Sequence, residues 1–383
     1  MRNTRWIHIL WVSLLTWNSA TAQKEIDGQA MKFGQLLGIV QHFHVDTVNV
    51  ERLTAIAITR LLEELDPHST YLSREEVQEA NEPLEGGFSG IGIQFNISND
   101  TLVVVDVIPG GPSEQVGLRA GDRVITVDGE NIAGTGITNA GVRARLKGEK
   151  NTLVKVGVSR ARQYIEFNIK RGMIPIHSID AAYMVTPSTG YIRVARFAAT
   201  TANEFEQAVG RLREEGMKDL VIDLQDNRGG YMGAAIEIAD HLLDARRLIV
   251  YTSGRDARAN ESFYSTPAGI FQDGRVVILQ DESSASASEI LAGAVQDWDR
   301  GIVAGRRSFG KGLVQRTFAL RDGAVIRLTV AHYYTPSGRD IQKSYAKGVN
   351  RYRAELLDRL SGGELFSPDS IHLADTTRYF TKE

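Results

Sequence analysis

The chain has 383 residues, of which 42% are hydrophobic and 8% aromatic, and this composition is enough to bury ordinary cores in two or three globular domains. Its 44 basic and 47 acidic residues give a net charge of -3, and without a long run of one sign the balance argues against nucleic acid or a lipid surface as a partner. There is no cysteine, which excludes disulfides, thiolate metal sites and a lipid-modified N-terminal cysteine.

The first 22 residues have the pattern of a secretory signal peptide. Arg2 and Arg5 form a basic start, an apolar run covers residues 6–17, and Ala20-Thr21-Ala22 is a small-residue cleavage signature. A membrane anchor is the alternative, but a span needs about 20 apolar residues and this run has roughly 12. We therefore expect cleavage near Ala22 and a periplasmic or otherwise exported soluble protein with no stable membrane span.

Residues 23–85 are predicted to form a helical N-terminal domain. Apolar residues recur at three- and four-residue steps from Ile26 to about Glu79. The segment Asp66-Pro67-His68-Ser69 interrupts this run, and Ser73 with Glu76 three residues later predicts a capping box at the start of a new helix.

Residues 86–172 are predicted to form a small β-rich domain. Glycines separate short β-branched runs such as residues 101–107 and 124–127, as expected for short strands joined by many turns. Residues 113–117 and 139–146 each have room for one short helix.

Residues 173–345 are predicted to form an α/β core, followed by a mixed, charged C-terminal tail over 346–383. Two apolar runs predict buried strands and two periodic segments predict helices: 221–224 and 276–279, then 233–243 and 287–295. Continuous apolar runs are typical of strands covered on both faces, so the alternation indicates a largely parallel central sheet.

Ser286 is a candidate nucleophile because it lies where the second apolar run turns into a helix. Backbone N–H groups at a helix start have no partner and favour developing negative charge. Taken alone, Ser284, Ser286 and Ser288 are better explained as an N-terminal cap with small-residue packing.

Lys311 is a candidate base, since it stands between Gly310 and Gly312 after an apolar run. A lysine base must be desolvated until its pKa falls from about 10.4 to about 7–8. Gln315, four residues on, can orient the amine without adding charge, whereas a carboxylate there would raise the lysine pKa. The alternative is an ordinary solvated loop lysine.

Residues 305–312 nearly match a phosphate-binding loop, but Gly312 has no hydroxyl for magnesium. The segments 313–318 and 325–330 predict a hairpin in place of the helix that such a loop requires. The eight histidines show no metal-ligand pattern. We therefore expect neither a cofactor nor a metal.

A second oxyanion donor is expected in the glycine turn at residues 226–230. This turn follows the buried strand 221–224, and α/β sheets place their sites past the carboxyl ends of central strands.

Several motifs together resemble the C-terminal processing peptidases, also called tail-specific proteases, a family of PDZ-containing serine peptidases with Ser/Lys catalysis. The motifs in the core are Ser284-Ala-Ser-Ala-Ser-Glu289, Phe309-Gly-Lys-Gly-Leu-Val-Gln315 and Asp223-Leu-Gln-Asp-Asn-Arg-Gly-Gly230. Residues 86–172 look like the PDZ domain of this family, and residues 66–72 are similar to the signature that precedes it. The resemblance covers about residues 30–345 and implies a multidomain α/β fold with a helical N-terminal region, a PDZ domain and a ClpP/crotonase-like protease core.

The resemblance implies a serine endopeptidase with Ser286 as nucleophile, Lys311 as general base and Gln315 as its orienter. The backbone N–H groups of Ala287 and of one glycine of the 229–230 pair, by preference Gly229, would bind the oxyanion.

The resemblance also implies that the loop of Gly90, Ile91, Gly92 and Ile93 captures protein or peptide substrates by their free, apolar C-terminal tails. Lys147 stands where many family members have an arginine, and Gln225 and Arg228 also depart from the usual pattern. The alternative function is a catalytically silent PDZ scaffold or adaptor, and the sequence leaves the oligomeric state open.

Overall fold

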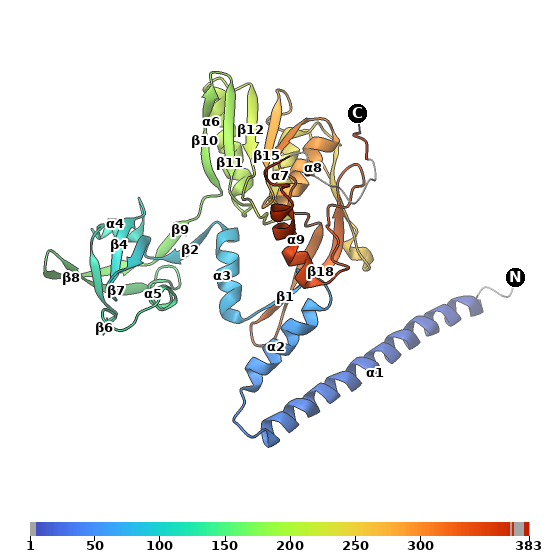
Figure 1. The fold of residues 1–383 in the computed structure, drawn as a ribbon, viewed down its shortest axis with the longest axis horizontal. Coiled ribbons are helices and arrows are strands. Elements are labelled where there is room, and N and C mark those ends of the chain that lie inside the picture. Colours follow the sequence, from blue (N-terminus) through green and yellow to red (C-terminus); the bar gives the residue numbers. More distant parts are fainter. Residues whose placement is uncertain (1–4, 368–369, 371–378, 383) are drawn as a thin grey trace. The chain divides into compact units, whose positions relative to one another are not determined.

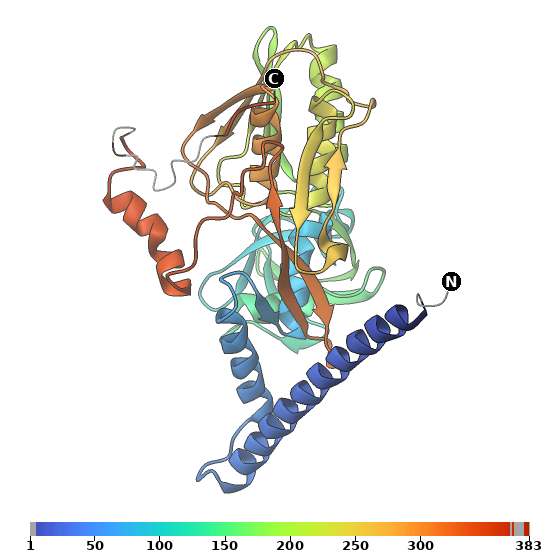
Figure 2. The same cartoon turned by 90° about the vertical axis from the view of Figure 1, so that its right-hand side faces the viewer.

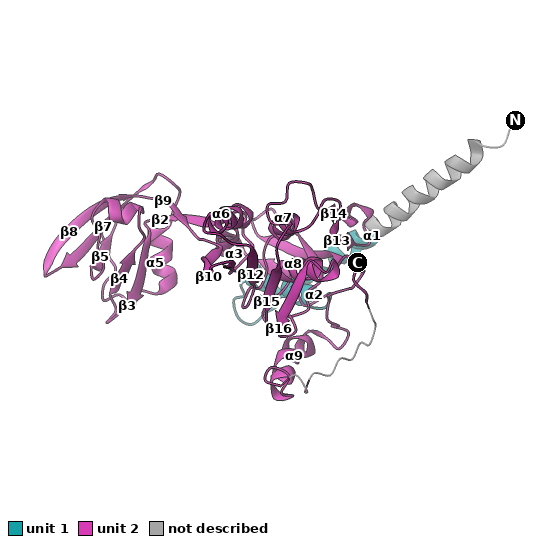
Figure 3. Ribbon diagram, turned by 90° about the horizontal axis from the view of Figure 1, so that it is seen from above, with its two compact units in different colours: residues 1–65 teal, residues 66–383 magenta. Residues whose placement is uncertain are grey.

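The computed structural model describes residues 5–367, 370 and 379–382, with side chains from residue 24 onward. The chain divides into two compact units, residues 1–65 and residues 66–383 (Figure 3).

The first unit consists of two helices, α1 (Arg5–Phe43) and α2 (Val50–Glu63). α2 begins after Asn49, whose side-chain oxygen accepts a hydrogen bond from the backbone N–H of Arg52 at 2.9 Å and so caps the helix. The helical periodicity predicted for these residues is confirmed. The predicted signal peptide lies outside the residues described with their side chains. Among the described residues, no helix combines the length and the apolarity needed to cross a membrane.

The second unit begins with a short strand and a capped helix, β1 (Thr70–Leu72) and α3 (Arg74–Glu85). The predicted capping box is confirmed: Ser73 Oγ accepts from the backbone N–H of Glu76 at 3.3 Å, and the Ser73 N–H donates to the Glu76 carboxylate at 2.8 Å. β1 departs from the expected all-helical region, because it pairs antiparallel with a strand of the α/β core. A three-residue strand is too short to leave a periodic pattern in the sequence.

The β-rich domain is a six-stranded sheet with two short helices (Figure 1). Its elements are β3 (Ile93–Ile97), β4 (Leu102–Val107), α4 (Pro112–Gln115), β5 (Arg123–Val127), β6 (Glu130–Asn131), α5 (Asn139–Leu146), β7 (Leu153–Arg160) and β8 (Gln163–Lys170). The strand order β3-β4-β5-β7-β8, with β6 beside β5, leaves β3 at one edge. α5 has the bounds predicted for it. Where the chain enters and leaves the domain, β2 (Gly87–Gly90) and β9 (Gly172–Pro175) pair antiparallel.

The α/β core is built on a five-stranded sheet in the order β10-β11-β12-β15-β16. Its elements are β10 (Ile179–Thr186), β11 (Thr189–Val194), α6 (Thr201–Glu214), β12 (Asp219–Asp223), α7 (Met232–Leu242), β15 (Val276–Gln280), α8 (Ala287–Asp297) and β16 (Gly301–Gly305). The last four strands of this order are mutually parallel and β10 is antiparallel. The predicted alternation of strands and helices around a parallel centre is therefore confirmed.

A second sheet of the core contains β1 and four later strands. These are β13 (Leu248–Ser253), β14 (Ser262–Tyr264), β17 (Leu313–Ala319) and β18 (Val325–Tyr334), with a 3-10 turn η1 (Ala257–Ala259) between β13 and β14. β17 and β18 form a long antiparallel hairpin, drawn in orange and red in Figure 2. The hairpin confirms the prediction for residues 313–330 and excludes the phosphate-loop interpretation, which requires a helix there.

The predicted C-terminal tail contains a helix that the sequence analysis missed, α9 (Val349–Ser361). Its buried residues are Tyr352 and Arg359. The signal was present, because Val349, Tyr352, Leu356 and Leu360 recur at three- and four-residue steps.

The predicted fold class, a multidomain α/β chain in which a β-rich domain precedes an α/β core, is confirmed. The β-rich domain and the core have separate clusters of buried apolar side chains. The residue boundaries assigned to the domains stay predictions.

Candidate active site

Ser286 lies at the turn between β15 and α8, as predicted, with φ 57° and ψ -113°. A positive φ costs a non-glycine residue of order 1–3 kcal/mol, so the surrounding contacts must hold the turn in this shape. One of them is a hydrogen bond of 2.7 Å from the Ser286 N–H to the carboxylate of Glu289.

Ser284, Ser286 and Ser288 differ in what their hydroxyl groups contact. Ser284 Oγ donates to the carbonyl oxygen of Leu224 at 2.8 Å, and Ser288 Oγ donates to that of Asn227 at 2.9 Å. Ser286 Oγ donates to no described residue; as the N-cap of α8 it forms a capping box with Glu289, and Ser286 lines a cavity of about 490 Å³. The packing explanation therefore fits Ser284 and Ser288, while Ser286 is left exposed to a ligand.

Lys311 and Gln315 line the same cavity as Ser286. Lys311 Nζ donates to Gln315 Oε1 at 3.4 Å. The amide group of Gln315 in turn donates to the backbone carbonyl oxygen of His68. With its N–H₂ group held by a carbonyl, the Gln315 side chain presents its oxygen to the amine.

The surroundings of Lys311 favour its neutral form. Burial lowers the pKa of Lys311 and the positive charge of Arg327 lowers it further, whereas the negative charges of Glu289 and Asp66 raise it. Within the described residues Lys311 forms no ion pair, and no hydrogen bond joins its Nζ to Ser286 Oγ. The two groups thus line one cavity without a hydrogen bond between them.

The glycine turn 226–230 packs directly against the serine turn. A Cβ atom on Gly229 would lie 2.8 Å from Ser286 Cβ and 3.0 Å from the Ala287 nitrogen. The Gly229 N–H already donates to the Asn227 side chain at 2.9 Å. The N–H groups of Gly230 and Ala287 have no partner among the described residues, and Gly230 lines the cavity. This arrangement favours Gly230 over Gly229 as the second oxyanion donor.

Glu289 is a residue to which the sequence analysis gave no role. Its side chain is 3% exposed, and its two oxygens accept four hydrogen bonds, from the N–H groups of Ser286, Gly310 and Lys311 and from Ser308 Oγ, at 2.7 to 2.9 Å. Burial raises the pKa of Glu289, while these hydrogen bonds act in the opposite direction. One carboxylate thus fixes the backbone of both candidate reactive residues.

Tyr333, on β18, joins the same two segments from another side. Its buried hydroxyl lies 3.0 Å from the carbonyl oxygen of Ser286 and also hydrogen-bonds the carbonyl oxygen of Lys311. Burial raises its pKa well above the ordinary value, which keeps the hydroxyl protonated and able to donate.

The segment that precedes β1 supports Gln315 through a turn organised by Asp66. The buried Asp66 carboxylate accepts from the N–H groups of His68 and Ser69, each at 2.8 Å, from Ser69 Oγ at 2.5 Å and from Thr329 Oγ1 at 3.0 Å. The carbonyl oxygen of His68 that receives the Gln315 amide belongs to this turn. Burial and the charges of Lys311 and Lys343 lower the pKa of His68 to about 4, so the imidazole adds no positive charge at neutral pH.

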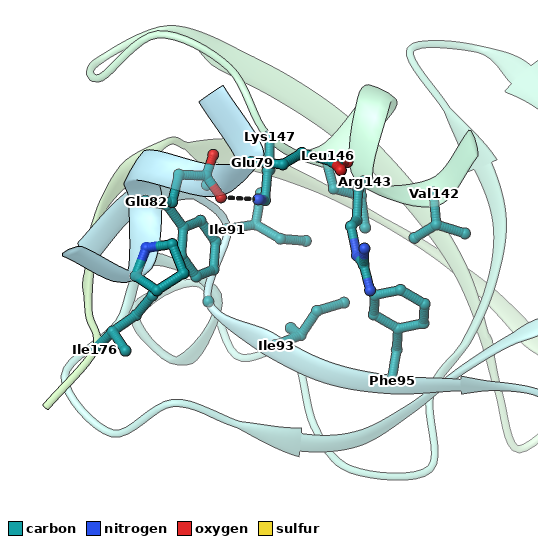
Figure 4. A pocket seen from close by; sticks show the side chains of 14 residues that line it. Glu79, Glu82, Ile91, Ile93, Phe95, Val142, Arg143, Leu146, Lys147 and Ile176 are labelled. Carbon is teal, nitrogen blue, oxygen red and sulfur yellow. Dashed lines mark hydrogen bonds and ion pairs between the residues drawn. The ribbon is translucent and has the colours of Figure 1, made fainter. Parts of the chain in front are cut away.

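A second cavity, of about 480 Å³, lies between β3 and α5 of the β-rich domain, with α3 beside it (Figure 4). We call it the β3–α5 groove. It is lined by the four loop residues predicted to bind a substrate tail, by Phe88, Phe95, Val142, Arg143, Leu146, Lys147 and Ile176, and by Glu79, Glu82 and Pro83 of α3. The backbone N–H groups of Ile91 and Gly92 have no partner among the described residues.

Two family models match the chain. Residues 89–170 match the PDZ domain, and residues 188–351 match peptidase family S41. Both matches agree with the recognition made from the sequence motifs.

Relatives with known names match over most of the chain. The carboxy-terminal processing protease CtpB of Bacillus subtilis (strain 168) is 30% identical over 335 residues, which cover 86% of this chain and 68% of that protein. The “Probable CtpA-like serine protease” of Staphylococcus aureus (strain N315) is 33% identical over 305 residues, 78% of this chain and 59% of that protein. Among solved structures, the photosystem II D1 C-terminal processing protease has 29% identity and a TM-score of 0.45, with 81% of this chain and 89% of that chain covered. The chain thus spans somewhat less than two thirds of the length of relatives such as the staphylococcal protein.

Proposed function

The chain belongs to the carboxy-terminal processing proteases of peptidase family S41, and from this premise we propose that it is an exported serine endopeptidase that cleaves proteins whose C-terminal tails it binds through its PDZ domain. The observation that carries the proposal is the cavity lined by Ser286, Lys311 and Gln315. It brings the Ser286 hydroxyl into one cavity with a desolvated amine that an uncharged amide orients.

In the proposed reaction Lys311 acts as base and then as acid. Its neutral amine takes the Ser286 proton while Oγ attacks the scissile carbonyl carbon, and its ammonium then protonates the leaving amine as the C–N bond breaks. Water, deprotonated by the amine, hydrolyses the resulting acyl ester and restores Ser286. Neither step requires a cofactor.

The developing oxyanion would be bound by the backbone N–H groups of Ala287 and Gly230. Both N–H groups are without partners in the described contacts, and donors aimed in advance at a developing charge lower the barrier. Gly229 keeps a supporting role, because its lack of a side chain lets the two turns approach.

The β3–α5 groove would bind the substrate tail. Its edge strand β3 can pair with an extended peptide, the N–H groups of Ile91 and Gly92 can receive the terminal carboxylate, and the apolar walls suit an apolar last side chain. Export is proposed from the N-terminal pattern of residues 1–22.

The experiment that tests the proposal is incubation of the protein with a loosely folded substrate that has a free, apolar C-terminus. We expect peptide-bond cleavage, detected by mass spectrometry. The alternative, a silent PDZ scaffold, is favoured by the missing contact between Ser286 Oγ and Lys311 Nζ. A scaffold would bind the tail and release the substrate uncut, and that outcome would overturn the assignment as an enzyme.

The cleavage rate is expected to rise with pH. The neutral fraction of Lys311 increases as pH passes through its lowered pKa, so the midpoint of the rise should lie below about pH 10.4, the pKa of an ordinary lysine. Removing the charge of Arg327 raises the Lys311 pKa, so Arg327→Gln should move the rise to higher pH. Arg316→Gln, on the same hairpin but absent from the charges that act on Lys311, is the matched control. A rate that fell above neutrality, in protein that circular dichroism shows to be folded, would contradict a lysine base.

Asp66 is expected to act on catalysis through Gln315. Asp66→Asn weakens the turn that carries the His68 carbonyl, so we expect kcat to fall about 10- to 100-fold, as a small misplacement of a reacting group can produce. On the alkaline plateau of the rate, where the charge of Asp66 no longer affects the neutral fraction of Lys311, the same substitution in a Gln315→Ala protein should have little further effect, because the group that the turn orients is already absent. Asp322→Asn, in the exposed hairpin turn, is the control. If Asp66→Asn lowered kcat by the same factor with and without Gln315→Ala, Asp66 would not act through Gln315.

A further inference from the structure

The β3–α5 groove carries four charged side chains, and their pairing is uneven. Lys147 Nζ forms an ion pair with Glu82, and Lys147 also lies over the ring of Phe88, 4.6 Å from its centroid. Glu79 comes from the same helix as Glu82. Arg143 lines the groove but its guanidinium has no ion pair or hydrogen bond to a described residue. The positive charge that remains available to a ligand is therefore that of Arg143.

Arg143 lies farther along the groove than the loop that would hold a terminal carboxylate. Figure 4 shows its side chain reaching toward Phe95, away from the Glu82–Lys147 pair. Phe95 is on β3 two residues past Ile93, so both side chains are on the same face of the strand. A tail whose C-terminus lies at the loop would extend along β3 toward Phe95. The residues that precede its C-terminus would therefore lie near Phe95.

The spacing along α5 identifies which residue of the tail Arg143 would meet. Leu146 and Arg143 are three residues apart, so their side chains share one face of the helix with Cβ atoms about 5–6 Å apart. In an extended peptide, side chains two residues apart point the same way and are separated by about 6.8 Å. When the last side chain contacts Leu146, the third side chain from the end therefore reaches Arg143, and the second points away.

We propose that Arg143 makes the groove select tails with an acidic side chain at the third residue from the C-terminus. This inference rests on the proposed tail binding by the PDZ domain and adds a substrate class to it: chains that end in an acidic residue, any residue, and an apolar residue. The selection comes from charge complementarity with Arg143, whose positive charge is not engaged in an ion pair with a described residue, unlike that of Lys147.

The test measures the dissociation constants of labelled peptides for the full chain carrying Ser286→Ala, so that the peptides stay uncut. The peptides are identical except that they end in Glu-Ala-Leu, Gln-Ala-Leu or Lys-Ala-Leu. Because an exposed ion pair is worth up to about 1 kcal/mol, we expect the Glu tail to bind about threefold tighter than the Gln tail and about tenfold tighter than the Lys tail, less so at high salt. Moving the acid to the second position, in Ala-Glu-Leu, should remove the advantage.

Substitutions on α5 identify the source of the preference. In the same background Arg143→Gln should bind the three tails equally, and Arg143→Glu should prefer the Lys tail. Arg145→Gln should keep the original preference, because Arg145 pairs with Glu130 and does not line the groove. Equal affinities in the parent protein, or a preference that survives Arg143→Gln, would overturn the inference.

One further peptide tests the role of Arg143 separately from the proposal that the groove binds a C-terminal tail. A C-terminally amidated Glu-Ala-Leu peptide should bind much more weakly than the free acid, since the loop would lose its carboxylate ligand. If the amidated and free peptides bound alike, tail capture by the groove would itself be wrong and the role of Arg143 would fall with it. If the free carboxylate is required but the charge upstream has no effect, only the role of Arg143 is wrong.

Discussion

Ser286→Ala and Lys311→Ala are each expected to lower the turnover of a tail-bearing substrate by about 10³-fold or more, the scale seen when a nucleophile or its base is removed from a serine protease. Ser286 is the serine of its turn whose hydroxyl faces the cavity. Lys311 is a buried amine whose pKa is lowered by that burial. Lys311→Arg should be equally inactive, because a guanidinium keeps its proton throughout the working range. The measurement is single-turnover cleavage followed by mass spectrometry.

Three controls separate chemistry from folding in this experiment. Ser288→Ala removes a buried hydrogen bond to Asn227 and should reduce stability by about 1 kcal/mol while turnover persists. Ser286→Gly should be inactive and yet more stable than the parent, because glycine adopts the positive φ of this position at lower cost. Tail affinity should be unchanged in all variants, since the β3–α5 groove shares no lining residue with the cavity. Substantial cleavage by either Ser286→Ala or Lys311→Ala would show that the roles are assigned wrongly.

The features predicted best from the sequence are those that depend on residues close together in the chain. The bounds of α5, the capping box at Ser73 and the hairpin β17–β18 depend on local periodicity, capping and turn chemistry. The pairing of Ser286 with Lys311, which line one cavity, was expected from the resemblance to the peptidase family. Each residue follows a strand of the parallel sheet, β15 or β16, so both lie at the same edge of that sheet.

The features of the candidate site that could not be predicted from the sequence depend on contacts between distant segments of the chain. The carbonyl of His68 and the amide of Gln315 are 247 residues apart, and Tyr333 reaches Ser286 across 47 residues. Gly229 was preferred as an oxyanion donor from the sequence, but its N–H donates a hydrogen bond to the side chain of Asn227, two residues away. This hydrogen bond depends on the conformation of the turn, which the residue types alone do not specify.

The side chain of Glu289 could have been singled out, since it stands three residues after Ser286 and a buried carboxylate at a helix start commonly accepts backbone N–H groups. Its further contacts with Gly310 and Lys311, 21 and 22 residues away, come only from the folded chain. They make Glu289 the group that couples the serine turn to the lysine loop.

Glu289→Gln is expected to lower both stability and activity strongly. The amide keeps the volume and one accepting oxygen, but its N–H₂ group replaces the other oxygen and faces two hydrogen-bond donors. Leaving two buried donors unsatisfied costs about 2–6 kcal/mol in the free energy of unfolding. Because the backbones of Ser286 and Lys311 are held by this carboxylate, we expect the cleavage rate of the folded fraction to fall at least about 100-fold.

The measurements are denaturant unfolding and cleavage below the melting temperature of the variant, where the folded fraction can be calculated. Glu282→Gln is the matched control, because Glu282 lies in the loop that leads into α8 but pairs with the more exposed Arg306, and this change should cost no more than about 1 kcal/mol. A loss of stability with an unchanged rate per folded molecule would limit Glu289 to holding the fold. A loss of rate beyond the unfolded fraction would instead mean that this buried carboxylate sets the geometry in which an amine and a hydroxyl can exchange a proton.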